Sequence, residues 1–212
     1  MSTNNIPGSF KYRIKAGDTM YNLAQKYNVS LNNMLAMNPS IDSDNLKIGQ
    51  TINMPLNNPV ATANIKGGPL RPQITGTVNF FDVPDGTWVC ADISGLPPYR
   101  PAVGSANPIG PHGFHVHEFG NCQTGDPGDP FQTAGGHWNP TNQPHGNHAG
   151  DFPVLFSNQG RASMCFFTSA FKPEQVIGKA VIIHQNPDDY RTQPAGNAGK
   201  RLACGVIQRF NG

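Results

Sequence analysis

The sequence is poor in charged residues and has no long apolar run. Charged side chains make up 13% of its 212 residues, about half the roughly 25% of an average globular protein, and the formal net charge is only +2. No block of Lys or Arg offers a surface for nucleic acid. No stretch approaches the roughly 20 apolar residues of a transmembrane helix. We therefore expect neither nucleic-acid binding nor membrane insertion.

The start of the chain, MSTNNIPGSF, lacks the basic end and apolar core of a signal peptide. The 4 cysteines are nevertheless enough for two disulfides, which form in oxidising compartments. We expect these two features to be reconciled either by a route out of the cytosol other than general secretion or by a leader that has been removed from the sequence.

Glycine and proline are abundant, at 24 and 20 residues, which predicts many turns and few long helices. The segments QITGTVNFFDV and GTWVCADISGL, with PDG between them, are rich in Val, Ile, Thr and aromatic residues and predict a hairpin. GRASMCFFTSAF and GKAVIIH read the same way. Short strands joined by long connections favour an all-β sandwich or Greek-key barrel for residues 61–212.

Residues 10–55 have a different pattern. KYRIKAG and QTINMP are extended, and between them GDTMYNLAQKYN has the apolar spacing of a helix, which Asp18 or Thr19 is placed to cap. A second short helix is expected after Ser30. The predicted buried positions of the two helices are Met20, Leu23, Ala24 and Tyr27, then Leu31, Met34 and Leu35. Residues 56–60 are a short polar linker.

The segment YRIKAGDTMYNLAQKYNVSLNNMLAMNPSIDSDNLKIGQTINMP resembles a LysM domain, through GDT after the first strand, NP after the second helix and the closing GQ. The resemblance implies a βααβ fold that binds chains of N-acetylglucosamine units, in peptidoglycan or chitin, along a shallow groove. The residues that it implies for the groove are Gly17, Asp18, Thr19, Met20 and Ile41.

Ligand-type side chains gather in two segments. In GPHGFHVHEFGNC, His115 and His117 would face the same side of a strand and could reach one ion. GGHWNPTNQPHGNHAGD adds three histidines and Asp151, and His184 ends an apolar strand. Three imidazoles with one carboxylate suit a structural zinc ion, and an all-imidazole set suits copper. Seven ligands fill two four-coordinate sites only if one imidazole is shared.

Residues 61–212 resemble copper/zinc superoxide dismutase, most like its bacterial members, through GFHVHEFGNC, GNAGKRLACGVI and the spacing GGHxxP, H, HxGD. The resemblance implies a Greek-key barrel holding copper and zinc. The copper ligands that it implies are His115, His117, His137 and His184, and the zinc ligands are His137, His145, His148 and Asp151. It implies that Asp188 links a copper-ligand histidine to a zinc-ligand histidine, and that Arg201 lies beside the open face of the copper.

The same resemblance pairs Cys122 with Cys204 in a disulfide. Cys90 and Cys165 lie in strands that its topology makes neighbours, so they could form a second bridge or remain two free thiols, and we favour buried free thiols. His112 and Trp138 are expected to have packing or surface roles rather than chemical ones.

The resemblances together imply an enzyme that converts superoxide to oxygen and hydrogen peroxide, with His137 as bridge and proton donor. A LysM domain would hold it at a cell wall or spore coat, outside the cytoplasm. The loop before Arg201 is short and lacks the acidic and basic cluster that guides substrate in eukaryotic members, and Lys200 and Arg191 read as solvated. The alternative is a noncatalytic, zinc-stabilised wall or coat protein that binds glycan. The number of subunits is left open.

Overall fold

The computed structural model describes residues 9–106 and 108–211. The chain divides into two compact units between Asn58 and Pro59. This division lies inside the segment expected as the linker, whose bounds of 56–60 stay a prediction. Across the described ranges, no helix combines the length and the apolar character needed to cross a bilayer.

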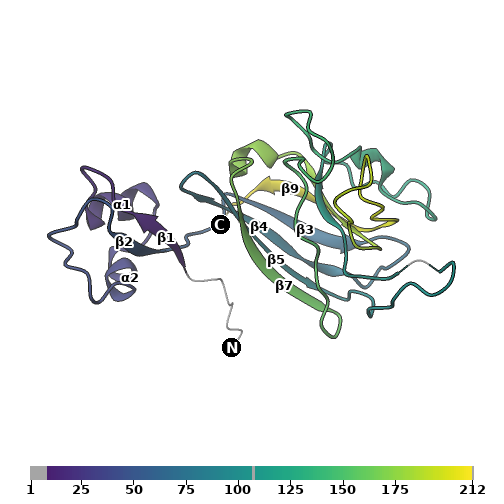
Figure 1. Cartoon of the computed structure of the whole chain (residues 1–212), viewed down its shortest axis with the longest axis horizontal. Coiled ribbons are helices and arrows are strands. Elements are labelled where there is room, and N and C mark those ends of the chain that lie inside the picture. The colour runs from purple at the N-terminus through teal and green to yellow at the C-terminus, as the bar shows by residue number, and fades with distance from the viewer. Residues whose placement is uncertain (1–8, 107, 212) are drawn as a thin grey trace. The chain divides into compact units, whose positions relative to one another are not determined.

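The first unit contains two strands and two short helices (Figure 1). In chain order these are β1 (Ser9–Arg13), α1 (Met20–Lys26), α2 (Leu31–Ala36) and β2 (Thr51–Pro55). The strands pair antiparallel, with Tyr12 opposite Ile52. Thr19, rather than Asp18, caps α1 by accepting a hydrogen bond from the backbone N–H of Asn22 at 3.0 Å, and Ser30 caps α2.

The apolar spacing of the first unit gives it a core of its own. Its buried residues are Tyr12, Ile14, Met20, Leu23, Ala24, Met34, Ile52 and Met54, and Tyr27, Leu31 and Ile41 pack partly buried against them. The prediction for Leu35 was wrong, because this side chain is 36% exposed. The helix ends one residue later, at Ala36, so no further turn extends an apolar face past Leu35.

The second unit is mainly β: one curled antiparallel sheet with long connections (Figure 1). Its strands are β3 (Ala61–Gly67), β4 (Thr75–Val83), β5 (Gly86–Ser94), β6 (Phe114–His117), β7 (Arg161–Thr168), β8 (Ala180–His184) and β9 (Arg201–Arg209). They lie in the order β6-β8-β9-β3-β4-β5-β7. Two 3₁₀ turns, η1 (Gln132–Ala134) and η2 (Pro173–Val176), interrupt the connections.

The predicted β4–β5 hairpin is confirmed, with Val83 opposite Gly86. Asp85 in its turn has φ +62°, a conformation that Asp tolerates better than most residues. β7 and β8 form where strands were expected, but they do not pair with each other. β7 lies beside β5 at one edge of the sheet, and β8 lies between β6 and β9.

Alternation along the strands builds the core of the second unit. In β5, Val89, Ala91 and Ile93 are buried while Trp88, Cys90 and Asp92 face outward. Each fully buried apolar side chain stabilises the fold by roughly 1.5–3 kcal/mol relative to exposure. Phe80, Phe152 and Phe171 form an aromatic group within this core, with ring centroids 6.5 and 6.1 Å apart for Phe80–Phe171 and Phe152–Phe171.

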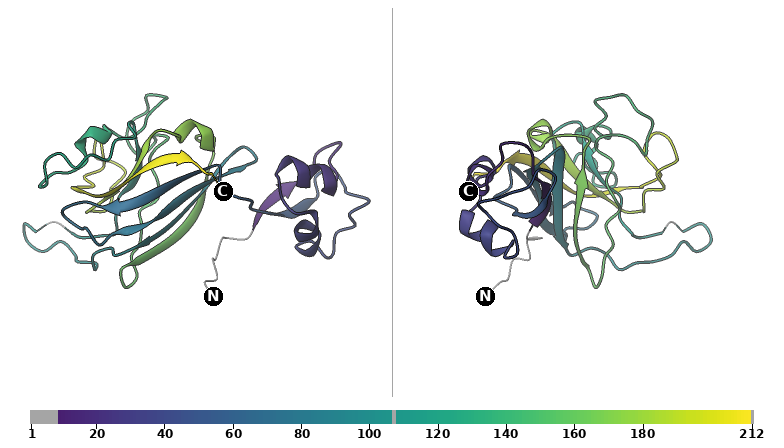
Figure 2. Two further views of the ribbon diagram at one scale, coloured as in Figure 1. Left: turned by 180° about the vertical axis from the view of Figure 1, so that it is seen from behind. Right: turned by 60° about the vertical axis from the view of Figure 1, so that its left-hand side comes forward.

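Strand β6 anchors the long connection that follows it. Trp138 donates its backbone N–H to the Val116 carbonyl at 2.8 Å, and Val116 donates to the Gly150 carbonyl at 2.9 Å. A side chain at Gly150 would collide with the Val116 and Trp138 backbones, so only glycine fits. The connection after β6 and the loop between β8 and β9 gather on the same side of the sheet in both views (Figures 1 and 2).

Candidate metal centre

The structure brings all the expected ligand side chains together in two groups that share one histidine. The first is His115, His117, His137 and His184, and the second is His137, His145, His148 and Asp151. Within each group, one ligand atom per residue lies within 4.8 Å of all the others. The strand β6 supplies His115 and His117, the end of β8 supplies His184, and the connection after β6 supplies the rest.

Hydrogen bonds to backbone carbonyls fix two rings of the first group. His117 donates its Nδ1–H to the Gly135 carbonyl at 3.0 Å, and His184 donates its Nδ1–H to the Gly199 carbonyl at 3.2 Å. The Nε2 atom of each neutral ring therefore carries a lone pair. These two Nε2 atoms are only 3.3 Å apart. Two acceptors at this separation repel unless a cation lies between them.

The other two histidines of the first group add lone pairs at the same place. His115 Nδ1 and His137 Nε2 are buried and have no hydrogen-bond partner among the described residues. The rings of His115 and His137 stack with centroids 3.8 Å apart. Four imidazole nitrogens thus converge without a proton donor, which is the donor set that suits copper.

Burial keeps the rings of His115, His117 and His184 neutral near pH 7. Loss of solvation, with the neighbouring histidines adding to it, lowers the pKa of His115 and of His117 well below the ordinary value. Burial is also the main cause that lowers the pKa of His184 to about 3. Neutral imidazole is the form that binds a metal.

The second group surrounds the carboxylate of Asp151. Its oxygens lie 2.9 Å from His137 Nδ1, 3.2 Å from His145 Nδ1 and 3.3 Å from His148 Nδ1. The last two nitrogens make no hydrogen bond within the described part of the chain. Burial alone would raise the pKa of Asp151, but hydrogen bonds from His137 and from the His148 backbone lower it overall. Three imidazoles and one ionised carboxylate are a donor set for tetrahedral zinc.

Asp188 connects the two groups through hydrogen bonds to one histidine of each. One oxygen accepts a hydrogen bond from His115 Nε2 at 2.7 Å, and the other accepts from His145 Nε2 at 2.9 Å. The side chains of His115, His145 and Asp188 are all fully buried. Gly196, at φ +63°, passes so close that a Cβ there would meet Asp188 and His145.

Several groups that hold the ligands were not singled out in the sequence. The carbonyls of Gly135 and Gly199 orient His117 and His184, and Gln193 ties the loop before β9 to His145 by accepting from its N–H at 2.9 Å. Backbone carbonyls have no sequence signature, and a lone glutamine has none either.

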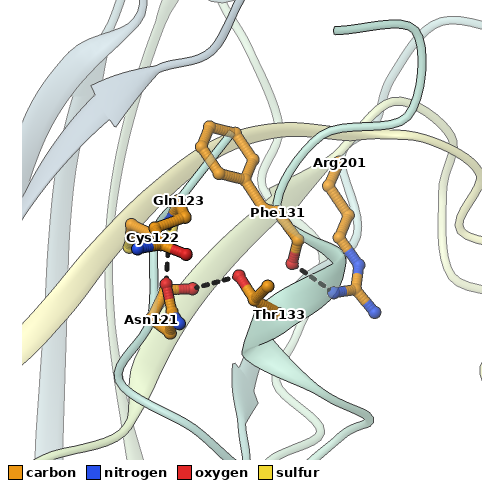
Figure 3. Close-up of a disulfide and its surroundings, with 7 residues drawn as sticks. Asn121, Cys122, Gln123, Phe131, Thr133 and Arg201 are labelled. Carbon is orange, nitrogen blue, oxygen red and sulfur yellow. Dashed lines mark hydrogen bonds between the residues drawn. A yellow bond between two sulfur atoms is a disulfide. The ribbon is translucent and has the colours of Figure 1, made fainter. Parts of the chain in front are cut away.

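Arg201 lies at the start of β9 beside the first group. Its Nη1 donates to the Phe131 carbonyl at 2.6 Å and its Nη2 to the Gly135 carbonyl at 2.7 Å. Figure 3 shows the guanidinium turned toward Phe131, with Cys122 on the adjoining segment. Cys122 and Cys204 form a disulfide, which ties this segment to β9.

A pocket of about 520 Å³ opens over the two groups. Its charged lining residues are Arg201 and Glu118, beside His117, His137, His148 and His184. Glu118 accepts a hydrogen bond from the Gly136 N–H at 3.2 Å. Lys200 donates to the Gly128 carbonyl at 2.6 Å, and neither Lys200 nor Arg191 lines this pocket.

The preference for free Cys90 and Cys165 thiols was wrong, because these residues form a second disulfide. The two residues are directly opposite each other in the β5–β7 ladder. Both lie half-buried on the outward positions of their strands rather than in the core. The register of the two strands thus brings the sulfur atoms together on the outer face of the sheet.

The two residues expected outside the chemistry are both buried. Trp138 packs against Phe171 with ring centroids 5.5 Å apart. His112 is 0% exposed, so a surface position is excluded. Its Nδ1–H donates to the backbone carbonyl of His184 at 2.8 Å, and burial lowers its pKa.

The residues expected to line a glycan groove have mixed exposure. Gly17 and Thr19 are exposed, and Ile41 is half-buried. The Asp18 carboxylate accepts hydrogen bonds from Tyr12 Oη at 2.9 Å and from the Lys15 N–H at 2.6 Å. Met20 is 3% exposed, so this residue offers almost no surface to a ligand.

Comparison with known families matches both units. Residues 74–207 match the family described as "Copper/zinc superoxide dismutase (SODC)", and residues 12–55 match the family described as "LysM domain".

Individual relatives agree. The chain is 37% identical over 156 residues to a "Superoxide dismutase [Cu-Zn]" of Deinococcus radiodurans, covering 66% of this chain and 80% of that protein. It is 36% identical over 146 residues to a protein of the same description from Legionella pneumophila, covering 65% and 80%. A solved double mutant of a SOD-like protein from Bacillus subtilis superposes with a TM-score of 0.55 at 29% identity, covering 69% of this chain and 96% of that one.

Proposed function

Because the chain belongs to the copper/zinc superoxide dismutase family, we propose that it converts superoxide to oxygen and hydrogen peroxide at a copper site joined to a zinc site through His137. The observation that carries this proposal is the position of the His137 ring. Its Nδ1 faces Asp151 in the second group, and its Nε2 lies unpaired among the nitrogens of the first.

Copper and zinc are the cofactors of this family, and both donor sets fit them. His115, His117, His137 and His184 would hold copper, while His137, His145, His148 and Asp151 would hold zinc. Bound copper supplies the one-electron exchange that oxidises one superoxide and reduces the next.

The protein's own residues then have three tasks. His137 would present its Nε2 lone pair to copper and, when this nitrogen is not bound, would take up a proton there from water and pass it to the reduced oxygen species, since Nε2 has no hydrogen-bond partner among the described residues. The carbonyls of Gly135 and Gly199 keep the Nε2 lone pairs of His117 and His184 pointed at the reaction centre. Asp188 holds His115 and His145 in the matching tautomers.

Arg201 attracts the anion. Two of its N–H groups are used by the Phe131 and Gly135 carbonyls, and a guanidinium has five. The remaining donors and the charge serve superoxide in the pocket that Arg201 lines.

The strand arrangement supports a Greek-key barrel. The sheet ends at β6 and β7, and the segment between Asp151 and Asn158 bridges to both regions, through His115–Asp151, His112–Leu155 and Asn158–Arg161. This segment would close the curled sheet on the side opposite β3.

The LysM unit would determine where the enzyme is located. We assign residues 10–55 to a βααβ glycan-binding module, residues 56–60 to the linker and residues 61–212 to the dismutase. A LysM domain and two disulfides suit a cell-wall or spore-coat location outside the cytoplasm. The groove would use the backbone around Gly17 to Thr19, with Ile41 opposite.

The decisive experiment measures copper and zinc content and superoxide dismutation of the full chain, before and after adding copper, beside His137→Ala. We expect near one copper and one zinc per chain, and at least about a hundredfold loss of activity in the variant, since proton donation alone supplies 10²–10⁴-fold. Zinc alone, with no activity after copper is supplied, would favour the noncatalytic wall protein.

The tether has a separate test. The full chain should sediment with insoluble peptidoglycan or chitin, and residues 59–212 should remain in the supernatant with unchanged dismutation. Equal sedimentation of both would exclude tethering by the first unit.

A further inference from the structure

A second pocket, of about 350 Å³, shares no lining residue with the pocket over the two ligand groups. It is formed by the loop before β6 and the segment after Leu155. Its lining residues are Pro97, Tyr99, Gly110, Pro111, His112, Phe156 and Ser157. This volume is at the small end of the roughly 300–1,000 Å³ of ligand-binding pockets.

One wall of this second pocket carries a buried hydrogen-bond acceptor. The His112 side chain is 0% exposed, and its Nδ1–H is used by the His184 carbonyl at 2.8 Å. Nε2 of this ring therefore has a lone pair, and it has no hydrogen-bond partner in the part of the chain that the structure describes. The backbone carbonyls of Pro97 and Gln185 also lie near the ring, so acceptors outnumber donors around it.

A second residue that lines this pocket also has an unpartnered polar atom. Ser157 Oγ is buried and has no hydrogen-bond partner among residues 9–106 and 108–211. A hydroxyl can donate and accept. Leaving such groups buried and unpaired costs free energy, so two of them in one pocket indicate that the pocket takes a polar group from outside the chain.

The rest of the second pocket is apolar and aromatic. Tyr99 is 64% exposed and Phe156 is 73% exposed, and Pro97 and Pro111 complete the lining. Large exposed aromatic side chains beside a pocket are a feature of binding sites rather than of ordinary surface.

We propose that this pocket binds a phenol, with the ring against Tyr99 and Phe156 and the hydroxyl between His112 and Ser157. A phenolic hydroxyl fits both polar groups, because it donates to His112 Nε2 and accepts from the Ser157 hydroxyl. Its aromatic body covers the apolar walls. The phenol can be a free small molecule or the side chain of a tyrosine in another polypeptide.

The test titrates the full metal-loaded chain, with its copper reduced, with 4-methylphenol and follows backbone amide shifts by NMR. We expect a Kd on the order of 1 mM for so small a ligand, with shifts confined to residues around Tyr99, His112 and Phe156. No saturable shift, or shifts centred on His117 and His137, would overturn the proposal.

Matched ligands separate the hydrogen bonds from apolar burial. 4-Methylanisole keeps the oxygen acceptor but lacks the donor, so it should bind about fivefold more weakly, and toluene should bind more weakly still. Equal affinities for all three would overturn the assigned role of His112 and Ser157.

Matched variants locate the site. Ser157→Ala should weaken 4-methylphenol about threefold and Phe156→Ala about fivefold or more. Phe167→Ala, which removes an aromatic ring that is 47% exposed on β7, should change nothing. If Phe167→Ala weakens binding as much as Phe156→Ala, the ring has another site and the proposal fails.

The source of the phenol is decided by a second ligand. N-Acetyltyrosine amide that binds more tightly than 4-methylphenol would assign the pocket to a tyrosine of a polypeptide. Equal or weaker binding would assign it to free phenols.

Discussion

Arg201 and His117 share one acceptor: both donate to the carbonyl oxygen of Gly135, at 2.7 and 3.0 Å respectively. The residue proposed to attract superoxide is thereby fixed to a residue proposed to bind copper. We expect Arg201→Lys to lower kcat/KM although it keeps the charge, because an ammonium lacks the planar fork that reaches the Phe131 and Gly135 carbonyls together. Arg201→Ala should lower kcat/KM about tenfold or more and reduce its salt dependence.

Stopped-flow measurement of superoxide decay at several ionic strengths checks both Arg201 variants, with metal content measured in each. If lysine performs as well as arginine, charge alone matters and the shared carbonyl has no part in catalysis.

Glu118 is the one carboxylate among the residues that line the metal pocket. Its negative charge opposes the approach of superoxide, so Glu118→Gln should raise kcat/KM about twofold at low salt, an advantage that fades above about 0.15 M. Glutamine keeps an oxygen for the Gly136 N–H. Glu174→Gln is the control, because it makes the same charge change on η2, outside the pocket lining. An equal rise of kcat/KM in this variant would mean that only the net charge of the protein matters.

The two disulfides form a natural comparison because they close loops of similar length, with sequence separations of 82 and 75. A chain-entropy estimate assigns each about 4–5 kcal/mol of stability. The pair Cys122→Ala/Cys204→Ala should lose activity as well, since that bridge holds the segment that positions Arg201. The pair Cys90→Ala/Cys165→Ala should lose stability alone. Urea unfolding measures the stability of both double variants, and dismutation assays measure their activity. Equal activities would contradict a role in activity for the Cys122–Cys204 disulfide alone.

Asp188→Asn should weaken zinc binding about 10- to 100-fold. An amide has a single oxygen acceptor, so its NH₂ group would face the N–H of either His115 or His145. Competition with a chelator measures zinc affinity, and Asp92→Asn, on the outer face of β5, is the charge-matched control. An unchanged affinity would show that the two histidines are oriented without this carboxylate.

The metal-free chain should lose stability in acid well above the range in which carboxylates titrate. Unfolded histidines take up protons near pH 6.5, whereas buried His184 has a pKa of about 3 and the pKa values of His115 and His117 are also well below ordinary. The unfolded state then binds more protons, so stability falls as the pH drops below 6.5, by up to about 1.4 kcal/mol per unit for each histidine. Urea midpoints between pH 7.5 and 4.5 check this, and a flat profile would contradict it.

The sequence singled out these side chains because metal binding needs particular residue types, and the structure places His115, His117, His184 and the other expected ligands together. The groups that orient them could not be foreseen. The Gly135 and Gly199 carbonyls exist at every position of a chain, and only the fold selects these two. Strand register likewise decides that Cys90 meets Cys165, and no local pattern fixes register over a separation of 75 residues.

The connection that carries His137, His145, His148 and Asp151 has few strand-type backbone hydrogen bonds. Its shape therefore depends on what its side chains bind. Without metal, exposed stretches such as Thr141–Pro144 would depend on hydrogen bonds within their own loop, such as those between Asn139 and Gln143, and exposed loop segments are where proteases cut. We therefore expect the lifetime of the protein to follow its metal supply. Copies that never acquire zinc would be cleared, and those that persist at the wall would be the loaded ones.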